Sequence, residues 1–263
     1  MSAAVHVAGV GLWAEGLPGF DALRARLAGA PAADTPGRPP AALLPPNERR
    51  RAPPQVLLAV EAAGQALAMS GLAPDAPACV FASAYGDQAT TDYLCATLAR
   101  APRELSPTRF HQSVHNAAAG YWTIATGCRA PSSALCAGPE SFGAGLLEAV
   151  LQVLADDRPV LLVACDTPGQ GPLAEMTACH DAFACALLLA PRADGALARL
   201  SLHPHHGPCA SLPWPEAFPA DWLGGNPSAG ALPLLVQLAS GSGRCRLPAA
   251  PRLGLDIHVE SPA

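Results

Sequence analysis

Three short runs of almost uninterrupted apolar residues constrain the fold of this chain more than any other feature. They cover residues 79–84 (CVFASA), 159–165 (PVLLVAC) and 183–190 (FACALLLA). Such runs, without polar alternation, are typical of strands covered on both faces. Helical segments alternate with them, above all Pro54–Gly71, which starts at a proline and ends at a glycine. This alternation predicts an α/β fold with a mostly parallel, mixed sheet and helices on both faces.

The two ends of the chain are predicted to add further elements. Val5–Trp13 (VHVAGVGLW) has the composition of a central strand, with glycines where another backbone must approach closely. Residues 19–29 are predicted to form a short amphipathic helix. Beyond residue 203 the sequence is rich in proline and glycine, with one short helix expected at 232–239 and a strand pair at 244–260.

Composition excludes several classes of function. The chain has 263 residues, of which 50% are hydrophobic and 14% are charged, so it can bury a large core. The net charge is −5 and the only basic block is Arg49–Arg51, which argues against a nucleic-acid partner. Nine cysteines without paired spacing indicate reduced thiols. Without a signal-peptide pattern or an apolar run of about 20 residues, we expect a cytoplasmic protein with no membrane insertion.

The segment 106–149 carries the features that point to function. Residues 115–127 are rich in alanine and end in glycine, which predicts a helix with a glycine stop. Residues 132–137 are small and apolar, as in a buried strand. Gly-Pro-Glu at 138–140 is then expected to open a second helix, since proline in the first turn loses no hydrogen bond. A strand that turns sharply into a helix N-terminus can stabilise an oxyanion or a thiolate, so many enzymes place a nucleophile there.

This segment resembles the active-site region of the β-ketoacyl synthases of the thiolase superfamily. In that family an Asn-Ala-Ala-Ala-Gly helix leads to a strand ending in Thr-Ala-Cys and then to a helix with Glu-Ala. The residues that match here without a gap are Asn116–Gly120, Gly127, Pro131, Glu148 and Ala149. The same register places Pro139 where the family keeps its acyl-accepting cysteine, and proline cannot accept an acyl group.

The resemblance implies a thiolase-like half-fold. Residues 1–203 would be the β-ketoacyl synthase-like N-terminal domain, and residues 204–263 a Pro/Gly-rich C-terminal extension packing on the same domain. These last 60 residues are too few for the second half of a condensing enzyme, which supplies two histidines and a lysine for decarboxylation. The implied role is a non-catalytic subunit similar to the chain length factors of aryl-polyene and type II polyketide pathways. It would pair with a full-length β-ketoacyl-ACP synthase and limit the length of the acyl or polyene chain, without a cofactor.

The residues that the resemblance implies at the partner interface and acyl pocket come from the same segment. They are Phe110, His111, Ser113, Asn116, Tyr121, Trp122, Leu135, Glu140 and Phe142. The four aromatic residues are the candidates for a pocket floor. A growing chain gains about 0.8 kcal/mol per buried CH₂ until it meets a bulky side chain, after which overpacking costs about 1–3 kcal/mol. Trp122→Ala is therefore expected to lengthen the product while the complex stays folded.

Two other functions remain open. Cys136 lies three residues before Pro139, which on a strand is about 10 Å away and on the opposite face. We favour a buried structural role for it, but a stand-alone acyltransferase or thioesterase using Cys136, with His111 or His115 as the base, is an alternative. The other alternative is a scaffold that binds an acidic acyl carrier protein through Arg49, Arg50 and Arg51.

Two remaining groups of polar residues are interpreted as structural. His203, His205, His206 and Cys209 fall within seven residues, but their spacing fits no common zinc site. A solvated loop is the favoured interpretation, and no metal is expected. Asp92, Asp166 and Asp181 show no paired-carboxylate spacing and are predicted to be caps and turn residues.

Overall fold

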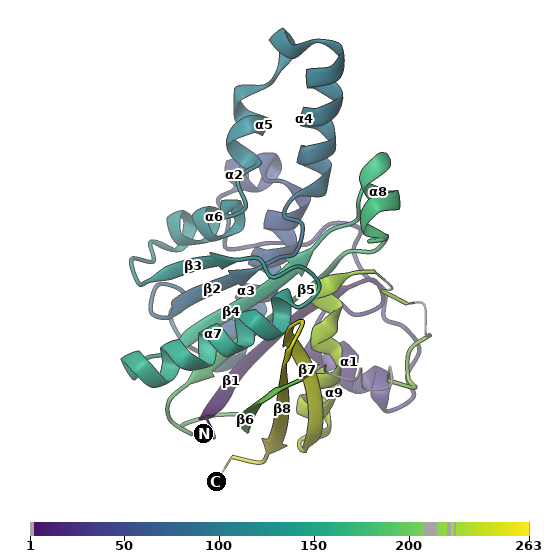
Figure 1. The fold of residues 1–263 in the computed structure, drawn as a ribbon. Coiled ribbons are helices and arrows are strands. Elements are labelled where there is room, and N and C mark those ends of the chain that lie inside the picture. The colour runs from purple at the N-terminus through teal and green to yellow at the C-terminus, as the bar shows by residue number, and fades with distance from the viewer. Residues whose placement is uncertain (1–2, 208–214, 220–221, 224, 263) are drawn as a thin grey trace.

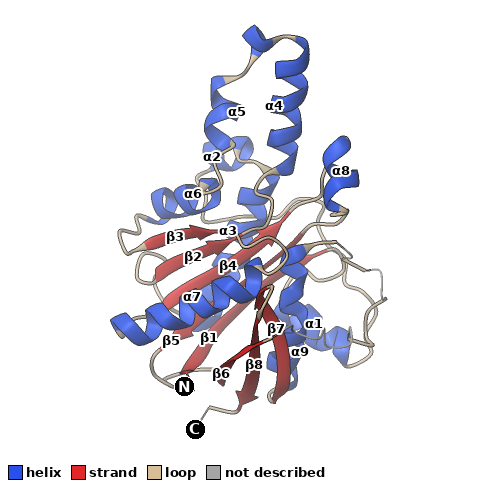
Figure 2. Cartoon of the chain, viewed as in Figure 1, coloured by secondary structure: helices blue, strands red, loops and turns tan. Residues whose placement is uncertain are grey.

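The strands of this chain form one eight-stranded sheet of order β3-β2-β4-β5-β1-β6-β8-β7, with helices on both faces (Figures 1 and 2). The computed structural model describes residues 3–207, 215–219, 222–223 and 225–262. The predicted α/β class and the helical cover on both faces are confirmed. No helix in the described ranges is long and apolar enough to cross a membrane. Of the nine cysteines, the eight that are described are free thiols.

The elements lie close to the predicted boundaries. The strands are β1 Ala3–Ala14, β2 Ala78–Ala82, β3 Ser132–Leu135, β4 Val160–Asp166, β5 Phe183–Ala190, β6 Ala198–His206, β7 Gly243–Ala250 and β8 Leu253–Glu260. The α-helices are α1 Phe20–Leu27, α2 Pro46–Arg51, α3 Pro54–Ser70, α4 Gln88–Arg100, α5 Pro107–Gln112, α6 Ala117–Thr126, α7 Ser141–Asp156, α8 Pro172–Thr177 and α9 Leu232–Ser240. Two short 3₁₀ helices are η1 Pro102–Glu104 and η2 Pro227–Ala231.

Parallel pairing is limited to one end of the sheet, which corrects the expectation of a mostly parallel sheet. Strand β2 pairs in parallel with β3 and β4, whereas the other five neighbouring pairs among the described strands are antiparallel. These parallel neighbours are joined by helical crossovers, with α4 to α6 between β2 and β3 and α7 between β3 and β4. The link from β4 to β5 holds only the six-residue α8, so β5 returns antiparallel beside β4.

The glycines of β1 allow helix α3 to lie directly on the sheet. A Cβ atom added at Gly9 would lie 2.0 Å from the carbonyl oxygen of Ala66, and one added at Gly11 would lie 1.8 Å from that of Ala62. No side chain fits at either position. The predicted close backbone approach is therefore confirmed, and it fixes α3 against the centre of the sheet.

Two hydrophobic clusters cover the two faces of the sheet. One includes side chains of α1, α7 and α9, among them Phe20, Phe142 and Leu235. The other includes α3 and α6, with Trp122 fully buried. The hairpin of β7 and β8 extends the same sheet through β6, so the C-terminal residues share the first cluster with the N-terminal elements.

Strand β3 is an exposed edge strand, which corrects the prediction of a buried strand at 132–137. Among the described strands, it pairs with β2 alone. Ser132 and Ala134 are exposed, whereas Ser133 and Leu135 are half-buried. Its small residues suit an uncovered edge as well as a core, so composition alone could not separate the two.

Candidate functional site

The sharp turn between β3 and α7 is the structural counterpart of the predicted nucleophile position. Helix α7 starts at Ser141, and Gly138 in the turn has a φ of 58°, which favours glycine. The Ser141 hydroxyl accepts a 3.0 Å hydrogen bond from the N–H of Ala137 and donates a 2.6 Å bond to the carbonyl of Gly138. These bonds close the turn, so the helix begins later than the predicted Gly138–Glu140.

The turn contains no free acyl acceptor at the position that the resemblance assigns. Pro139 is exposed but carries only a hydrocarbon ring. The hydroxyl of Ser141, the nearest alternative, is 1% exposed and uses both hydrogen bonds to hold the turn. The half-buried Glu140 is the N-cap residue, and its side chain makes no capping bond. At the position that the resemblance assigns, the turn therefore offers no side chain that is free to accept an acyl group.

Cys136 is exposed, which corrects the expectation that it is a buried structural cysteine. It follows the last residue of the edge strand β3, where no neighbouring strand covers it. Its Sγ lies 3.3 Å from the carbonyl oxygen of Ala84. The ring Nε2 of His115 lies 3.0 Å from the carbonyl oxygen of Ser83, and His111 is exposed on α5. Both Cys136 and His115 thus contact the segment after β2, but the structure shows no hydrogen bond between them.

Asp166 is the centre of a buried polar network where β2 and β4 end. It is fully buried, and its Oδ1 accepts hydrogen bonds from Ser83 Oγ at 2.8 Å and from the N–H groups of Ala84 and Tyr85 at 3.0 and 3.2 Å. Its Oδ2 accepts a 2.6 Å bond from Ser228 Oγ. Burial raises the pKa of Asp166, and these hydrogen bonds oppose that rise.

This network joins four parts of the chain. Gln55 of α3 donates from Nε2 to Ser83 Oγ at 2.9 Å. Asn226 donates from Nδ2 to the carbonyl oxygens of Asp166 at 3.0 Å and Asp181 at 2.8 Å. The network fixes the segment after β2 that Cys136 and His115 contact. The sequence predicts only a turn residue at Asp166. The feature that could have indicated a buried network is a carboxylate directly after the fully apolar run 159–165.

The four predicted floor aromatics do not converge on one cavity. Trp122 and Phe142 belong to hydrophobic clusters on opposite faces of the sheet. Phe110 is 61% exposed, and Tyr121 is half-buried with its hydroxyl accepting a 3.0 Å hydrogen bond from Gln112 Nε2. Only Phe110 and Tyr121 are therefore available to a surface that a partner could cover.

The other predicted interface residues lie around α5, α6 and the end of β3. Ser113 is half-buried and donates a 2.8 Å bond to the carbonyl of Phe110. Asn116 is exposed at the start of α6, and Leu135 is the half-buried last residue of β3. This region also exposes large apolar side chains, with Val114 at 51% and Ile124 at 84%.

The remaining predicted sites lie elsewhere. Arg49–Arg51 form the end of the short helix α2. His203, His205 and His206 lie on strand β6 rather than in a loop, because this segment pairs along its length with β8. Cys209 is outside the described residues. Among the residues that the structure describes, no group of three or more His, Cys, Asp or Glu side chains could hold a metal ion.

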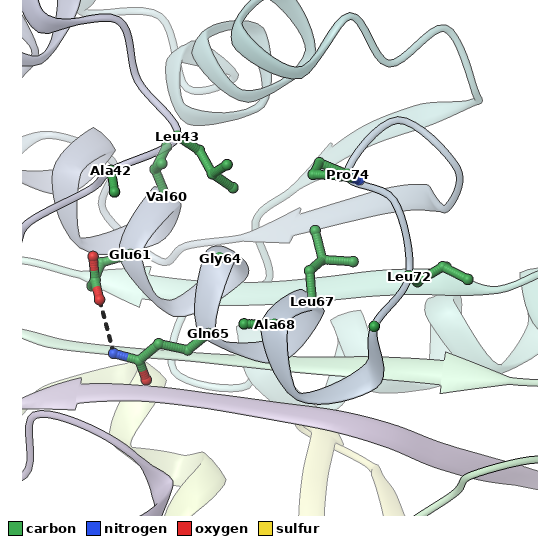
Figure 3. Close-up of a pocket in the computed structure, with 11 residues that line it drawn as sticks. Ala42, Leu43, Val60, Glu61, Gly64, Gln65, Leu67, Ala68, Leu72 and Pro74 are labelled. Carbon is green, nitrogen blue, oxygen red and sulfur yellow. Dashed lines mark hydrogen bonds between the residues drawn. The ribbon is translucent and has the colours of Figure 1, made fainter.

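An apolar groove of about 490 Å³ runs beside the C-terminal half of α3 (Figure 3). Leu43, Leu67 and Pro74 line it, and a 3.0 Å hydrogen bond between Gln65 and Glu61 crosses one side. Gln55, which contacts the Asp166 network, is at the opposite end of this helix. The groove is therefore separate from the turn and from the network.

Comparisons with known proteins agree with this geometry. A sequence profile of the family described as beta-ketoacyl synthase, N-terminal domain, matches residues 24–214. A search of curated protein sequences gave no match. A solved chain from the complex of the ketosynthase ApeO with its chain length factor ApeC from Xenorhabdus doucetiae is 26% identical, with a TM-score of 0.72, over 97% of this chain and 99% of that chain.

Two further structures are similar in fold at lower identity. The ishigamide ketosynthase/chain length factor is 14% identical, with a TM-score of 0.73, over 98% of this chain and 100% of that chain. A chain from the complex AntDE:AntF, of a type II polyketide synthase acyl-carrier protein with its ketosynthase, is 12% identical, with a TM-score of 0.73. The match covers 98% of this chain and 99% of that chain. The profile match spans most of the sequence, and the fold agrees along its whole length. This chain belongs to the β-ketoacyl synthase family and carries its N-terminal domain.

Proposed function

We propose that this chain is a non-catalytic partner of a full-length β-ketoacyl-ACP synthase and limits the length of the chain that the synthase builds. The observation that carries the proposal is the turn before α7, which has Pro139 in place of an acyl acceptor and a Ser141 hydroxyl already used by the turn. The products we propose are acyl, aryl-polyene or polyketide chains, in keeping with the chain length factors among the similar structures.

The edge strand β3 supports a heterodimer. Its free side carries unpaired backbone N–H and C=O groups, which can pair with a strand of another subunit. In the condensing enzymes that this chain resembles, the strand before the cysteine pairs across the two-fold axis in this way. Exposed apolar side chains on the neighbouring helices, including Phe110 and Ile124, provide surface that association would bury.

Control of length would then act at the interface. Phe110 and Tyr121 are the predicted floor residues that are open to solvent, so a partner that covers α5 and α6 would enclose them. An acyl chain that reached them would lose the gain of about 0.8 kcal/mol per CH₂ and meet an overpacking cost of about 1–3 kcal/mol. That difference is sufficient to stop elongation.

Co-expression with a ketosynthase of the same pathway tests the proposal. We expect a one-to-one complex by size-exclusion chromatography with mass determination, and condensation activity that depends on the ketosynthase cysteine. A chain that stays a monomer or homodimer in the presence of the ketosynthase would contradict the proposal.

The exposure of Cys136 favours a second candidate, a stand-alone acyltransferase or thioesterase. A reactive acyl-thioester probe separates the two functions. Stable acylation of Cys136 in the isolated chain, lost when His115 is replaced by Gln, would support the second candidate. No acylation is expected if the chain acts only as a partner subunit.

A further inference from the structure

The outer side of helix α7 carries a row of apolar side chains that no described α-helix covers. Helix α7 lies across one face of the sheet and packs on it through residues such as Phe142 and Val153 (Figure 1). On its other side Leu151 is 51% exposed, Leu154 is 49% exposed and Leu147 is half-buried. Single exposed leucines are ordinary on protein surfaces, but three in a row along one helix form a contiguous apolar patch.

This row has the spacing of a coiled-coil contact. Ala144, Leu147, Leu151 and Leu154 follow one another at intervals of three, four and three residues, which is the pattern of alternating a and d positions in a heptad. All four are at least partly exposed, whereas Ala149, on the side toward the sheet, is fully buried. A helix that only covers a sheet needs one apolar side. The second apolar side, here called the α7 seam, therefore indicates a surface for another helix.

The two ends of α7 carry opposite charges that have no partner among the described residues. Glu140 is the half-buried N-cap residue, and its side chain makes no capping bond. Arg158 is exposed two residues after the end of the helix. Neither side chain forms an ion pair with a described residue, whereas the neighbouring Asp157 pairs with Arg192 at 2.7 Å. One cation and one anion are therefore available at opposite ends of the seam.

We propose that the α7 seam is the contact between two copies of this chain, with the two α7 helices antiparallel about a two-fold axis. With the axis at the middle of the helix, Leu147 lies opposite Leu151 of the second copy, and Ala144 lies opposite Leu154 of the second copy. Each pairing occurs twice, as a two-fold contact requires. A small side chain opposite a large one allows the two helices to interlock.

The end charges favour a second copy over a different partner. The axis that pairs the seam residues also places Glu140 opposite Arg158 of the second copy, because both pairs are centred on the same point of the helix. A parallel arrangement would instead bring the two Glu140 side chains together. Antiparallel helices also place opposite dipole ends side by side. The chain thus supplies both halves of this contact, whereas a different partner would need its own matching row and charges.

One acidic side chain opposes the contact and limits its strength. Glu148 flanks the seam close to the axis, so the Glu148 side chains of the two copies come near each other. Gln152 of the same helix donates a 2.8 Å hydrogen bond to Oε1 of Glu148. Asp156 lies seven residues after the buried Ala149 and hence away from the seam. The helix of 16 residues is about 24 Å long. From this short contact we expect a reversible dimer with a dissociation constant on the order of micromolar.

The proposal does not rest on the proposed function. Helix α6, with Ile124, packs on the opposite face of the sheet from α7, so a ketosynthase and a second copy would use different surfaces. A complex with a ketosynthase would then contain two copies of each chain, and their ratio would stay one to one. Each contact can be lost without the other.

Sedimentation velocity of the full chain at about 1 to 100 μM tests the proposal. All variants carry Ile124→Asp, which removes association through the proposed ketosynthase surface. We expect a dimer whose dissociation constant rises at least tenfold with Leu151→Asp, because the charge is desolvated in the contact. Leu98→Asp is the matched control, since Leu98 is 53% exposed on α4, and it should change the constant less than about twofold. Leu151→Ala, with a smaller expected rise, is the second variant if Leu151→Asp does not fold.

Exchange of the end charges tests the antiparallel arrangement. Glu140→Lys and Arg158→Glu should each raise the dissociation constant at least threefold, because like charges then lie opposite each other at both ends of the contact. The double variant restores opposite charges and should return the constant to within about twofold of its starting value. Glu148→Gln should lower the dissociation constant, since it removes the repulsion near the axis.

Four results would overturn the proposal. They are a monomer throughout the concentration range, equal dissociation constants for Leu151→Asp and Leu98→Asp, a double charge variant as weak as the single ones, and loss of ketosynthase binding in Leu151→Asp. The last result would assign the α7 seam to the ketosynthase. An intact dimer that does not bind a ketosynthase would contradict only the proposed function.

Discussion

The hydroxyl of Ser228 donates a 2.6 Å hydrogen bond to Oδ2 of Asp166, and both side chains are buried. This bond links the segment before α9 to the end of β4. The other carboxylate oxygen has three donors, but Oδ2 has no second donor among the described residues. Oδ2 therefore depends on the Ser228 hydroxyl alone for its hydrogen bond among the described residues.

Ser228→Ala is expected to destabilise the fold by about 1–3 kcal/mol, because it leaves a buried carboxylate oxygen without its donor. Urea denaturation followed by circular dichroism measures the change in the free energy of unfolding. Ser242→Ala is the matched control, since Ser242 is exposed between α9 and β7. Equal stability of the two variants would show that the bond contributes nothing.

Asp166 predicts a dependence of stability on pH. Burial raises its pKa in the folded state above the usual 3.8, so the folded state binds the proton more tightly than the unfolded state. Its contribution to stability is full below pH 3.8 and is lost as the pH rises through the raised value. Asp166→Asn cannot ionise, so the stability of the wild type relative to this variant should fall as the pH rises above 3.8. A stability difference that does not change with pH would contradict the prediction.

Native-state alkylation should separate the cysteines by exposure. N-ethylmaleimide is expected to modify Cys95 and Cys136, the exposed members of the described set, and to spare Cys185, whose thiol pKa is raised by burial. Peptide mapping by mass spectrometry identifies the modified sites. In the complex with a ketosynthase, Cys136 should be protected because the partner covers the end of β3. Labelling at an unchanged rate in that complex would place the interface elsewhere.

Ile124→Asp is expected to weaken the ketosynthase complex at least tenfold. The side chain is 84% exposed on α6, so the charge costs little in the isolated chain but is desolvated under a partner. Leu151→Asp on α7, at a side chain 51% exposed, is the control and should leave binding within about twofold. Size-exclusion chromatography and thermal unfolding of both variants separate loss of association from loss of folding.

Replacing Phe110, which is exposed at the proposed interface, should change product length without loss of stability. Phe110→Ala is expected to shift the products of the heterodimer to longer chains, because an exposed side chain contributes little to the fold. Trp122→Ala should instead cost about 3–5 kcal/mol, since Trp122 is fully buried. The expectation that Trp122→Ala leaves the complex folded therefore conflicts with its burial. Mass spectrometry of the products measures chain length, and unfolding curves for both variants measure stability. Together they separate a role in setting product length from a role in holding the fold.

Local signals in the sequence were sufficient for most of the elements. Proline and glycine set the ends of α3, and the uninterrupted apolar run of β5 was predicted residue for residue. The turn before α7 followed from Gly138 and Pro139. These features depend on backbone preferences and burial that neighbouring residues determine.

Features that depend on distant segments were missed. Whether β3 is central or at an edge depends on which strand lies beside it, and its four residues do not specify this. The partners of Asp166 come from segments more than 60 residues away along the chain in both directions. Likewise, Arg244 and His203 both lie next to His258 only once β6, β7 and β8 are paired in one sheet.

The open edge of β3 has a consequence for how this protein is made. The strand Ser132–Leu135 contains no lysine, and its only protection against pairing with the wrong chain is its short length. If the chain pairs with a ketosynthase as proposed, molecules synthesised in excess of that partner would expose this edge and the neighbouring Ile124 to one another. Balanced synthesis of the two proteins would then protect the chain against aggregation, and overproduction of this chain alone would favour insoluble material.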